Sequence, residues 1–155
     1  MKVYRVERAK YLKMTLSGHG AAMTKGFRWN SLNTRLVYTS DSRALATLEV
    51  TAHLDMAEDL PNDRYYVEIE IPQEIKIQEI TKADLPRNWD AKPPNHATQV
   101  IGDSFVLASE AAVLKVPSAI VPFEFNYLIN PLHPDAKRIK VTSKTPMKFD
   151  HRLKG

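Results

Sequence analysis

The clearest pattern along the chain is an alternation of apolar and polar residues between positions 65 and 71. One face of this segment carries Tyr, Val, Ile and Ile and the other carries Tyr, Glu and Glu, as expected of a strand with one face on a hydrophobic core. Pro72 ends it. Shorter runs of Val, Ile, Leu and Tyr predict further strands. They lie at residues 3–7, 35–39, 75–80, 98–101, 114–116, 125–129 and 138–142.

A helical pattern follows the strand predicted at residues 35–39. Ser40 or Asp41 can cap its first turn, and the pattern continues to about Asp55. The apolar stripe of this helix consists of Leu45, Leu48 and Ala52.

A second helix is expected to begin after Gly102-Asp103 and to end before Val116-Pro117. It would carry small residues suited to close packing against a sheet, namely Ala108, Ala111 and Ala112. Residues 84–96 contain three prolines and predict an irregular surface loop. Strands with two embedded helices predict an α+β fold, with one compact domain over residues 1–155 and mixed or antiparallel sheets.

Composition narrows the classes of function. The 155 residues contain no cysteine, which excludes thiolate zinc sites, iron–sulfur clusters and a cysteine nucleophile. No apolar stretch approaches the roughly 18 residues that span a bilayer, and the charged N-terminal segment has no signal-peptide core. We therefore expect a cytoplasmic protein that does not associate with a membrane. The net charge of +4 and the pI near 9.3 are compatible with a small anionic ligand or with nucleic acid.

Standard cofactor and catalytic motifs are absent from the sequence. With only five glycines, it contains no GxGxxG, no GxxxxGK[ST], no HExxH and no GxSxG. Dehydrogenase, NTPase, zincin and serine hydrolase functions are therefore not expected. The five histidines have no metal-ligand spacing, and we predict no metal site.

Arg28 is the first candidate for chemistry. It lies between Phe27 and Trp29, where aromatic packing could hold its guanidinium and present it to a phosphate or a carboxylate. The alternative is a surface arginine that stacks on Trp29.

Glu49 and His53 form a second candidate, one turn apart at the edge of the apolar stripe of the first helix. An acid beside a buried face can be pre-organised for electrostatic work, whereas a solvated Glu/His pair is the alternative. Tyr38 ends the preceding strand and could converge with Glu49 at one edge of the sheet, or it could belong to the core.

Ser118 lies in an apolar stretch that prolines interrupt, and a hydroxyl there needs a partner, either a backbone group or a ligand. Asn126 and Asn130 follow in the same stretch and raise the same question. Packing at a bend in a strand is the alternative for all three.

Six segments carry a family resemblance, in this order and over nearly the whole chain. They are GFRWN, RLVYTS, ALATLE, the end of TQVIGDSF, VPSAIVP and FNYLINPLHPD. Together they resemble the RES domain, the toxin of a bacterial two-gene toxin–antitoxin system that is named for Arg, Glu and Ser. The resemblance implies a fold similar to ADP-ribosyltransferases of the diphtheria-toxin type and an activity that consumes NAD as its substrate, with no bound cofactor. The sequence departs at Ser104-Phe105, where relatives often carry an aromatic such as Trp after IGD, and we expect this to affect packing more than chemistry.

The resemblance also assigns site residues. Arg28, Glu49 and Ser118 match the three namesake residues, and Tyr38 matches the active-site tyrosine of the family. These four are the expected catalytic residues. The expected NAD-binding residues are Arg28, Tyr38, His53, Ser118 and Asn126.

The resemblance implies a role for each catalytic residue in breaking the nicotinamide–ribose bond. Glu49 would stabilise the oxocarbenium-like charge on the ribose, and Arg28 would clamp a phosphate of the substrate. Tyr38 would stack on the nicotinamide ring, and Ser118 would bind its amide or orient Glu49. Because the leaving group is already cationic, no general acid is needed. The acceptor stays open: water, inorganic phosphate or a protein side chain.

The resemblance further implies a cognate Xre-type helix-turn-helix antitoxin. It would occlude the NAD site in a higher-order complex and contact promoter DNA itself, so that the toxin does not bind nucleic acid directly. Two other hypotheses remain open. One is a basic nucleic-acid-binding module, suggested by the aromatic and basic residues at 25–29. The other is an interaction protein that has lost catalysis.

Overall fold

The alternating segment at residues 65–71 forms β3 (Arg64–Glu70), and its apolar side chains Val67 and Ile69 are fully buried. The structure is a computed structural model, and it describes residues 1–23, 26–54 and 60–153. The other strands are β1 (Lys2–Arg8), β2 (Val37–Ser40), β4 (Ile77–Glu79), β5 (Val113–Pro117), β6 (Phe125–Ile129) and β7 (Lys140–Met147). The α-helices of the described chain are α1 (His19–Ala22), α2 (Arg43–Thr51) and α3 (His96–Ala108). Short 3-10 helices are η1 (Ala9–Met14), η2 (Lys82–Asp84), η3 (Pro134–Arg138) and η4 (His151–Leu153).

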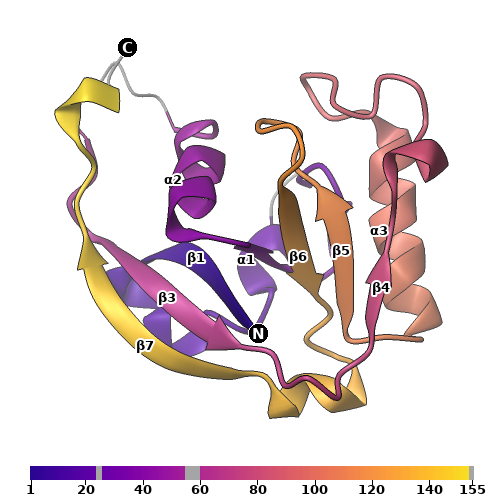
Figure 1. Cartoon of the computed structure of the whole chain (residues 1–155), viewed down its shortest axis with the longest axis horizontal. Coiled ribbons are helices and arrows are strands. Elements are labelled where there is room, and N and C mark those ends of the chain that lie inside the picture. Colours follow the sequence, from indigo (N-terminus) through magenta and orange to yellow (C-terminus); the bar gives the residue numbers. More distant parts are fainter. Residues whose placement is uncertain (24–25, 55–59, 154–155) are drawn as a thin grey trace.

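The strands form a seven-stranded sheet in the order β4-β5-β6-β2-β1-β3-β7. The β4–β5 pair is parallel and all other neighbours are antiparallel. Figure 1 shows β1, β3 and β7 on one side of the molecule and β6, β5 and β4 on the other. A mixed sheet with a few embedded helices confirms the α+β prediction.

The two halves of the sheet meet between β1 and β2, where Tyr4 and Ser40 are paired. Beside this pair, Nη1 of Arg5 on β1 donates a hydrogen bond to the carbonyl oxygen of Tyr38 on β2 at 3.2 Å. The core consists of two clusters. One includes Val3 of β1 together with Val113 of β5 and Ile129 of β6, so it spans both halves of the sheet, and the other includes Leu114 of β5 and Leu128 of β6.

α2 begins later than predicted. Its N-cap is Ser42, whose hydroxyl accepts a hydrogen bond from the backbone N–H of Leu45, so the prediction of Ser40 or Asp41 was wrong. The predicted apolar stripe is also only partly right, because Leu48 is 40% exposed. α2 ends at Thr51, and residues 52–54 are not helical, so the helix is shorter than the prediction of an end near Asp55; Asp55 itself lies outside the described residues.

α3 corrects two predictions at once. The strand expected at residues 98–101 is helical, because the side chain of Asn95 accepts hydrogen bonds from the N–H groups of Ala97 and Thr98 and starts the helix there. Gly102-Asp103 therefore lies inside α3, and the helix ends at Ala108 with Ser109 in the left-handed conformation.

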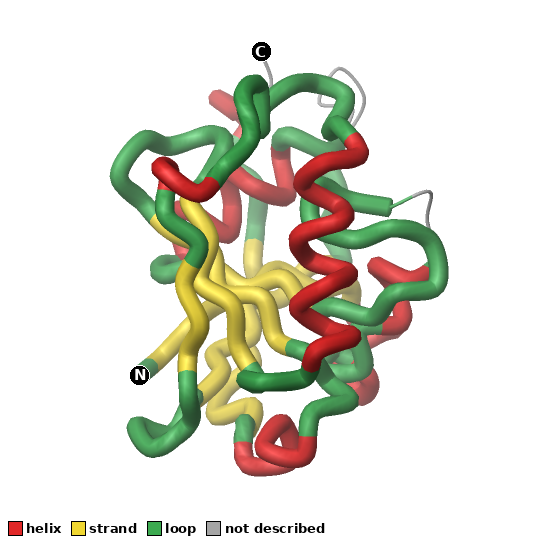
Figure 2. The backbone as a smooth tube through the Cα atoms, turned by 90° about the vertical axis from the view of Figure 1, so that its right-hand side faces the viewer, coloured by secondary structure: helices red, strands yellow, loops and turns green. Residues whose placement is uncertain are grey.

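The three small residues predicted for the second helix are split by this correction: Ala108 ends α3, whereas Ala111 and Ala112 are buried beside the start of β5. Phe105, at the position where the family pattern differs, packs with Leu114 and Leu128 in the second core cluster. Figure 1 and Figure 2 show α3 beside the half of the sheet that contains β4, β5 and β6. Residues 84–96 are largely irregular, as predicted. No described helix has the length and apolar character needed to cross a bilayer.

Candidate active site

Glu49 reaches from α2 to the ends of two strands. Its Oε1 accepts a hydrogen bond from the hydroxyl of Ser118 at 2.8 Å and another from Nδ2 of Asn126 at 2.7 Å. Ser118 follows β5, and Asn126 lies on β6. Within the described chain, Oε2 of Glu49 has no hydrogen-bond partner. The carboxylate is therefore fixed through one oxygen, and the other oxygen is available.

Ser118 is buried and its hydroxyl is fully engaged. While it donates to Glu49, it accepts hydrogen bonds from the N–H groups of Ile120 and Val121, each at 3.1 Å. Its own N–H donates to the carbonyl oxygen of Glu124 at 2.8 Å. Of the two roles expected for Ser118, this geometry matches the orientation of Glu49, because its lone pairs and its proton are all used within the protein.

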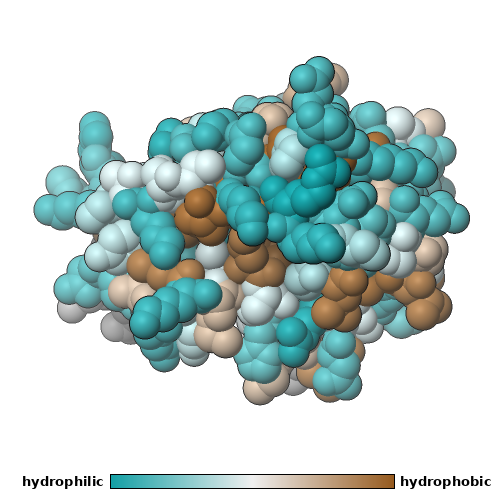
Figure 3. All heavy atoms as spheres, turned by 90° about the horizontal axis from the view of Figure 1, so that it is seen from below, coloured by the Kyte–Doolittle hydropathy of each residue, from teal (hydrophilic) through white to brown (hydrophobic). Residues whose placement is uncertain are grey.

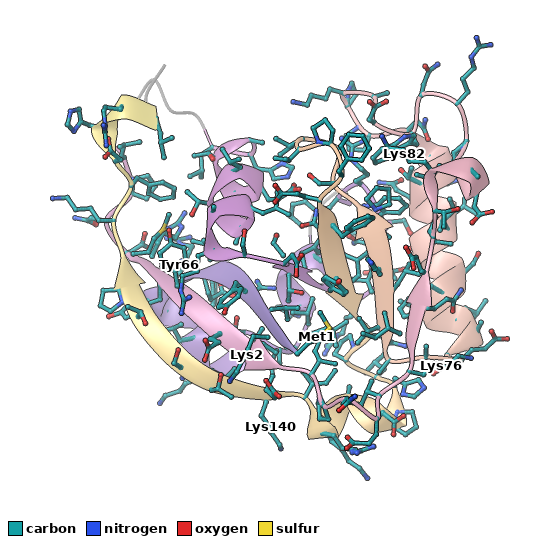
Figure 4. The ribbon with its side chains drawn as sticks, in the orientation of Figure 1. Met1, Lys2, Tyr66, Lys76, Lys82 and Lys140 are labelled. Carbon is teal, nitrogen blue, oxygen red and sulfur yellow. The ribbon has the colours of Figure 1, made fainter. Side chains whose placement is uncertain are left out.

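α2 itself is seated on the other half of the sheet. The hydroxyl groups of Thr47 on α2 and Tyr66 on β3 lie 2.8 Å apart in a hydrogen bond. Figure 4 labels Tyr66 on β3 near the start of α2. Because Thr47 and Glu49 contact opposite halves, α2 bridges the two parts of the sheet and carries the carboxylate between them.

Arg28 is held by main-chain oxygens. Its Nη1 donates to the carbonyl oxygens of Trp89 at 2.8 Å and Ala91 at 3.0 Å, both in the proline-rich loop. Of the two aromatic neighbours that could hold Arg28, Trp29 is buried in the core and tilted against Trp89. In the part of the chain that the structure describes, Nε and Nη2 of Arg28 have no hydrogen-bond partner and can form a two-pronged contact with an anion.

The charge of Arg28 is subject to opposing effects. Partial burial lowers the pKa of Arg28, and the negative charges of Glu49 and Asp90 act in the opposite direction. Arginine stays protonated in proteins, so its charge persists near that of Glu49. Positive and negative groups thus face the same region from a loop and from α2.

Tyr38 is fixed by its hydroxyl. It donates to Oδ1 of Asn30 at 2.6 Å and accepts from the N–H of Trp29 at 3.2 Å. Burial raises the pKa of Tyr38 above its usual range, so the phenol is neutral. Its hydroxyl is satisfied within the protein, which leaves the ring as the part of the side chain that could contact a ligand.

Phe27 connects Tyr38 with His53. Its ring makes edge contacts with both, at centroid distances of 5.5 Å to Tyr38 and 5.7 Å to His53. His53 is exposed, and among the described residues no hydrogen bond or ion pair joins it to Glu49. Asn130, the other polar residue singled out, is buried and its Oδ1 accepts from the N–H of Leu132, as a packing residue at a bend would.

Three residues that were not predicted from the sequence support the segment that carries Arg28. Asn30 is completely buried, and its Nδ2 donates to the carbonyl oxygens of Ala21, Ser31 and Thr34. Asp103 on α3 accepts from the N–H and the hydroxyl of Ser31. A Cβ at Gly102 would lie 1.6 Å from the carbonyl oxygen of Trp29, so the loop packs directly on the helix. Asn30 ends the GFRWN segment, and Gly102-Asp103 belongs to the IGD motif. Their place in these family segments is the only sequence feature that could have indicated this supporting role.

The described chain has a depression away from these residues. It has a volume of about 530 Å³, is lined among others by Leu16, Ile139 and Lys140, and shares no residue with the candidate site. It belongs to the underside of the molecule, where Figure 3 shows apolar patches among polar residues. The described residues contain no group of three or more His, Asp or Glu side chains placed to hold a metal ion.

Comparison with known proteins identifies the family. The model of the RES domain matches residues 2–150, and the chain therefore belongs to the RES domain family. It is 44% identical over 140 residues to the "Prs ADP-ribosylating toxin" of Sphingobium sp. (strain YBL2), covering 89% of this chain and 86% of that protein. It is 37% identical over 155 residues to "Toxin Res" of Photorhabdus laumondii, covering 99% and 97%.

A solved structure supports the fold independently. The crystal structure of the M. tuberculosis MbcT-MbcA toxin–antitoxin complex contains a chain that matches with a TM-score of 0.76 at 16% identity, covering 94% of this chain and 83% of that one. The resemblance inferred from the six sequence segments is confirmed, and so is the fold class.

Proposed function

We propose that this protein is a toxin that cleaves the nicotinamide–ribose bond of NAD⁺. The observation that carries the proposal is the carboxylate of Glu49, which is fixed through Oε1 by Ser118 and Asn126 while Oε2 is unpaired within the described chain. The family membership and the names of the relatives support it.

The chemistry requires a fixed negative charge. As the bond between the ribose C1′ and the pyridinium nitrogen breaks, its electron pair goes to nitrogen and neutralises the nicotinamide, and positive charge develops on the ribose. Oε2 of Glu49 would face this charge and stabilise it. A carboxylate that is already oriented costs little reorganisation at that moment, which is the basis of electrostatic catalysis.

Arg28 and Tyr38 would hold the two ends of the substrate. Nε and Nη2 of Arg28 fit the geometry of a phosphate oxygen pair, with Nη1 anchored to Trp89 and Ala91. The ring of Tyr38 would stack on the nicotinamide, beside Phe27 and His53. Neutral nicotinamide leaves without a proton donor, and no bound cofactor or metal is required.

The acceptor distinguishes three forms of the reaction. Water would give ADP-ribose, inorganic phosphate would give its 1-phosphate, and a protein nucleophile would give an ADP-ribosylated protein. In each case the acceptor bonds to C1′ and releases its proton to solvent. The relative named a Prs ADP-ribosylating toxin favours transfer to a protein as the second candidate function.

A cognate antitoxin would restrain the activity. A toxin–antitoxin complex among the structural neighbours supports such a partner. We propose an Xre-type antitoxin that covers the region of Glu49 and Arg28 in the cytoplasm, within a higher-order complex.

The test is incubation of the purified chain with NAD⁺ in three conditions: buffer alone, buffer with phosphate, and buffer with purified Prs, the protein acceptor that the name of the Sphingobium relative gives. Mass spectrometry would identify released nicotinamide and the ADP-ribosyl product. Nicotinamide release in at least one condition supports the proposal, and the product identifies the acceptor. Intact NAD⁺ and unlabelled protein in all three would contradict it.

A further inference from the structure

Behind Glu49 lies a second polar contact that connects it to β2. Nδ2 of Asn126 donates to Glu49 at 2.7 Å, and Oδ1 of the same amide accepts from the hydroxyl of Ser40 at 2.7 Å. Ser40 is 4% exposed and Asn126 is 9% exposed. Three side chains from β2, β6 and α2 thus form a chain of hydrogen bonds that ends on the carboxylate.

The register of the sheet builds this chain. Ser40 and Asn126 are directly paired across β2 and β6, so their side chains lie next to each other on the same face. A primary amide has a donor side and an acceptor side, and burial requires that both be satisfied. Because Nδ2 must face the carboxylate, Oδ1 faces Ser40, and Ser40 is its only hydrogen-bond donor in the described chain.

We propose that Ser40 is a positioning residue for Glu49, acting through Asn126. This inference rests on the function proposed above. Without the Ser40 hydroxyl, Oδ1 of Asn126 would be buried and unpaired, and the amide would rotate to find another donor. Glu49 would then lose one of the two hydrogen bonds that fix Oε1, while the path to its free oxygen and the contacts of Arg28 would be unchanged.

The neighbouring residue Thr39 provides a matched control. It is 2% exposed, and its hydroxyl also donates to β6, but to the backbone carbonyl oxygen of Tyr127 at 2.6 Å. That bond supports strand pairing and does not lead to Glu49. Thr39→Val therefore removes a buried hydroxyl of the same sheet without touching the proposed chain.

The experiment measures kcat and KM for nicotinamide release from NAD⁺, in the condition that supports wild-type turnover. Ser40→Ala is expected to lower kcat about tenfold with KM nearly unchanged, since misplacement of a catalytic group affects the transition state more than substrate binding. Ser40→Thr, which keeps the hydroxyl, is expected to retain kcat. The pair Ser40→Thr and Ser40→Val differs only in hydroxyl against methyl and repeats the test if the alanine variant does not fold.

A double-mutant cycle separates positioning from a general structural effect. If Ser40 acts through Glu49, Ser40→Ala should have little further effect on kcat in a Glu49→Gln background, whereas Thr39→Val should act equally in both backgrounds. A tenfold loss from Ser40→Ala in both backgrounds would overturn the inference, and so would unchanged kcat in Ser40→Ala and Ser40→Val.

The failure of the proposed function has a different signature. It would show as no nicotinamide release by wild type, or as a Glu49→Gln variant as active as wild type, and either result would also remove the role of Ser40. A slow Glu49→Gln variant together with a fully active Ser40→Ala variant would overturn the Ser40 inference alone.

Discussion

The two charged ends of the candidate site are built in different ways. Glu49 is held by the side chains of Ser118 and Asn126, which come from a strand end and a strand of one sheet. Arg28 is held by carbonyl oxygens of a loop, at Trp89 and Ala91. The first end depends on the identity of individual side chains, and the second depends on the path of the backbone.

This difference implies different responses to mutation. At the Glu49 end, removal of one hydroxyl should change the chemistry and leave the fold intact. At the Arg28 end, the largest effects should come from residues that shape the loop, because main-chain oxygens cannot be removed by substitution. The segment that carries Arg28 is in turn supported by α3, because Gly102 packs on the backbone of Trp29 and Asp103 accepts a hydrogen bond from Ser31.

The largest expected effect is on stability, from a substitution where α3 packs on the segment that carries Arg28. Gly102→Ala should lower the free energy of unfolding by about 3 kcal/mol, because the new Cβ would meet the backbone of Trp29 and the helix would have to move away. Gly20→Ala is the control, since no atom lies within 4 Å of its Cβ position and a helical alanine is expected to be neutral or stabilising. Urea unfolding of both variants measures the difference, and equal midpoints would contradict the close contact.

Next in size is Ser118→Ala. It removes one donor to Glu49, so we expect a loss of about 2 kcal/mol in transition-state stabilisation, seen as a fall of about thirtyfold in kcat. It also leaves two N–H groups unpaired, which lowers the free energy of unfolding and not kcat. KM should change little. Ser104→Ala, at an exposed helical position, is the control. A rise in KM with normal kcat would show that Ser118 binds the substrate and does not orient the carboxylate.

Arg28→Lys should give the complementary result. Lysine keeps the charge but has no planar fork, so we expect KM for NAD⁺ to rise about tenfold while kcat changes less. Steady-state kinetics over a wide NAD⁺ range would measure both. If kcat fell and KM did not, the two ends of the site would not divide the work of binding and catalysis in this way.

The smallest expected effect is the pH-dependent part of the difference in stability between wild type and Tyr38→Phe. Burial raises the pKa of Tyr38, whereas an unfolded tyrosine ionises near pH 10, so ionisation of Tyr38 favours the unfolded state once the pH exceeds about 10. The wild type should therefore lose about 0.8 kcal/mol more stability than Tyr38→Phe between pH 8 and pH 10.5. Urea unfolding at both pH values tests the sign, and equal losses would contradict a buried neutral phenol.

Local patterns predicted much of the fold. The alternation that forms β3 and the runs that form β5 and β6 reflect burial of one or both faces of a strand, which a sequence records directly. α3 was misread, because Val100 and Ile101 suggested a strand and Gly102 suggested a helix boundary. Gly102 is needed for close packing against Trp29, which is a tertiary requirement that local propensity cannot express.

The candidate site also has a part that the sequence could predict and a part that it could not. The convergence of Ser118 and Asn126 on Glu49 involves the residues selected from the sequence, whereas the anchors of Arg28 are carbonyl groups that every residue has. Asn30 was also not predicted as a supporting residue, because the burial of a single amide in a loop leaves no periodic pattern in the sequence. The catalytic and NAD-binding roles of the six selected residues stay predictions.

The most direct measurement is the rate of nicotinamide release from NAD⁺ by wild type and by Glu49→Gln. The amide keeps the size of the side chain and can still be held by Ser118, but it removes the negative charge that faces the ribose. We predict a folded variant with an unchanged unfolding midpoint and a rate lower by about a hundredfold, the size expected for one lost electrostatic contact in a transition state. Equal rates for the two proteins would contradict the assignment of Glu49 as the group that drives cleavage.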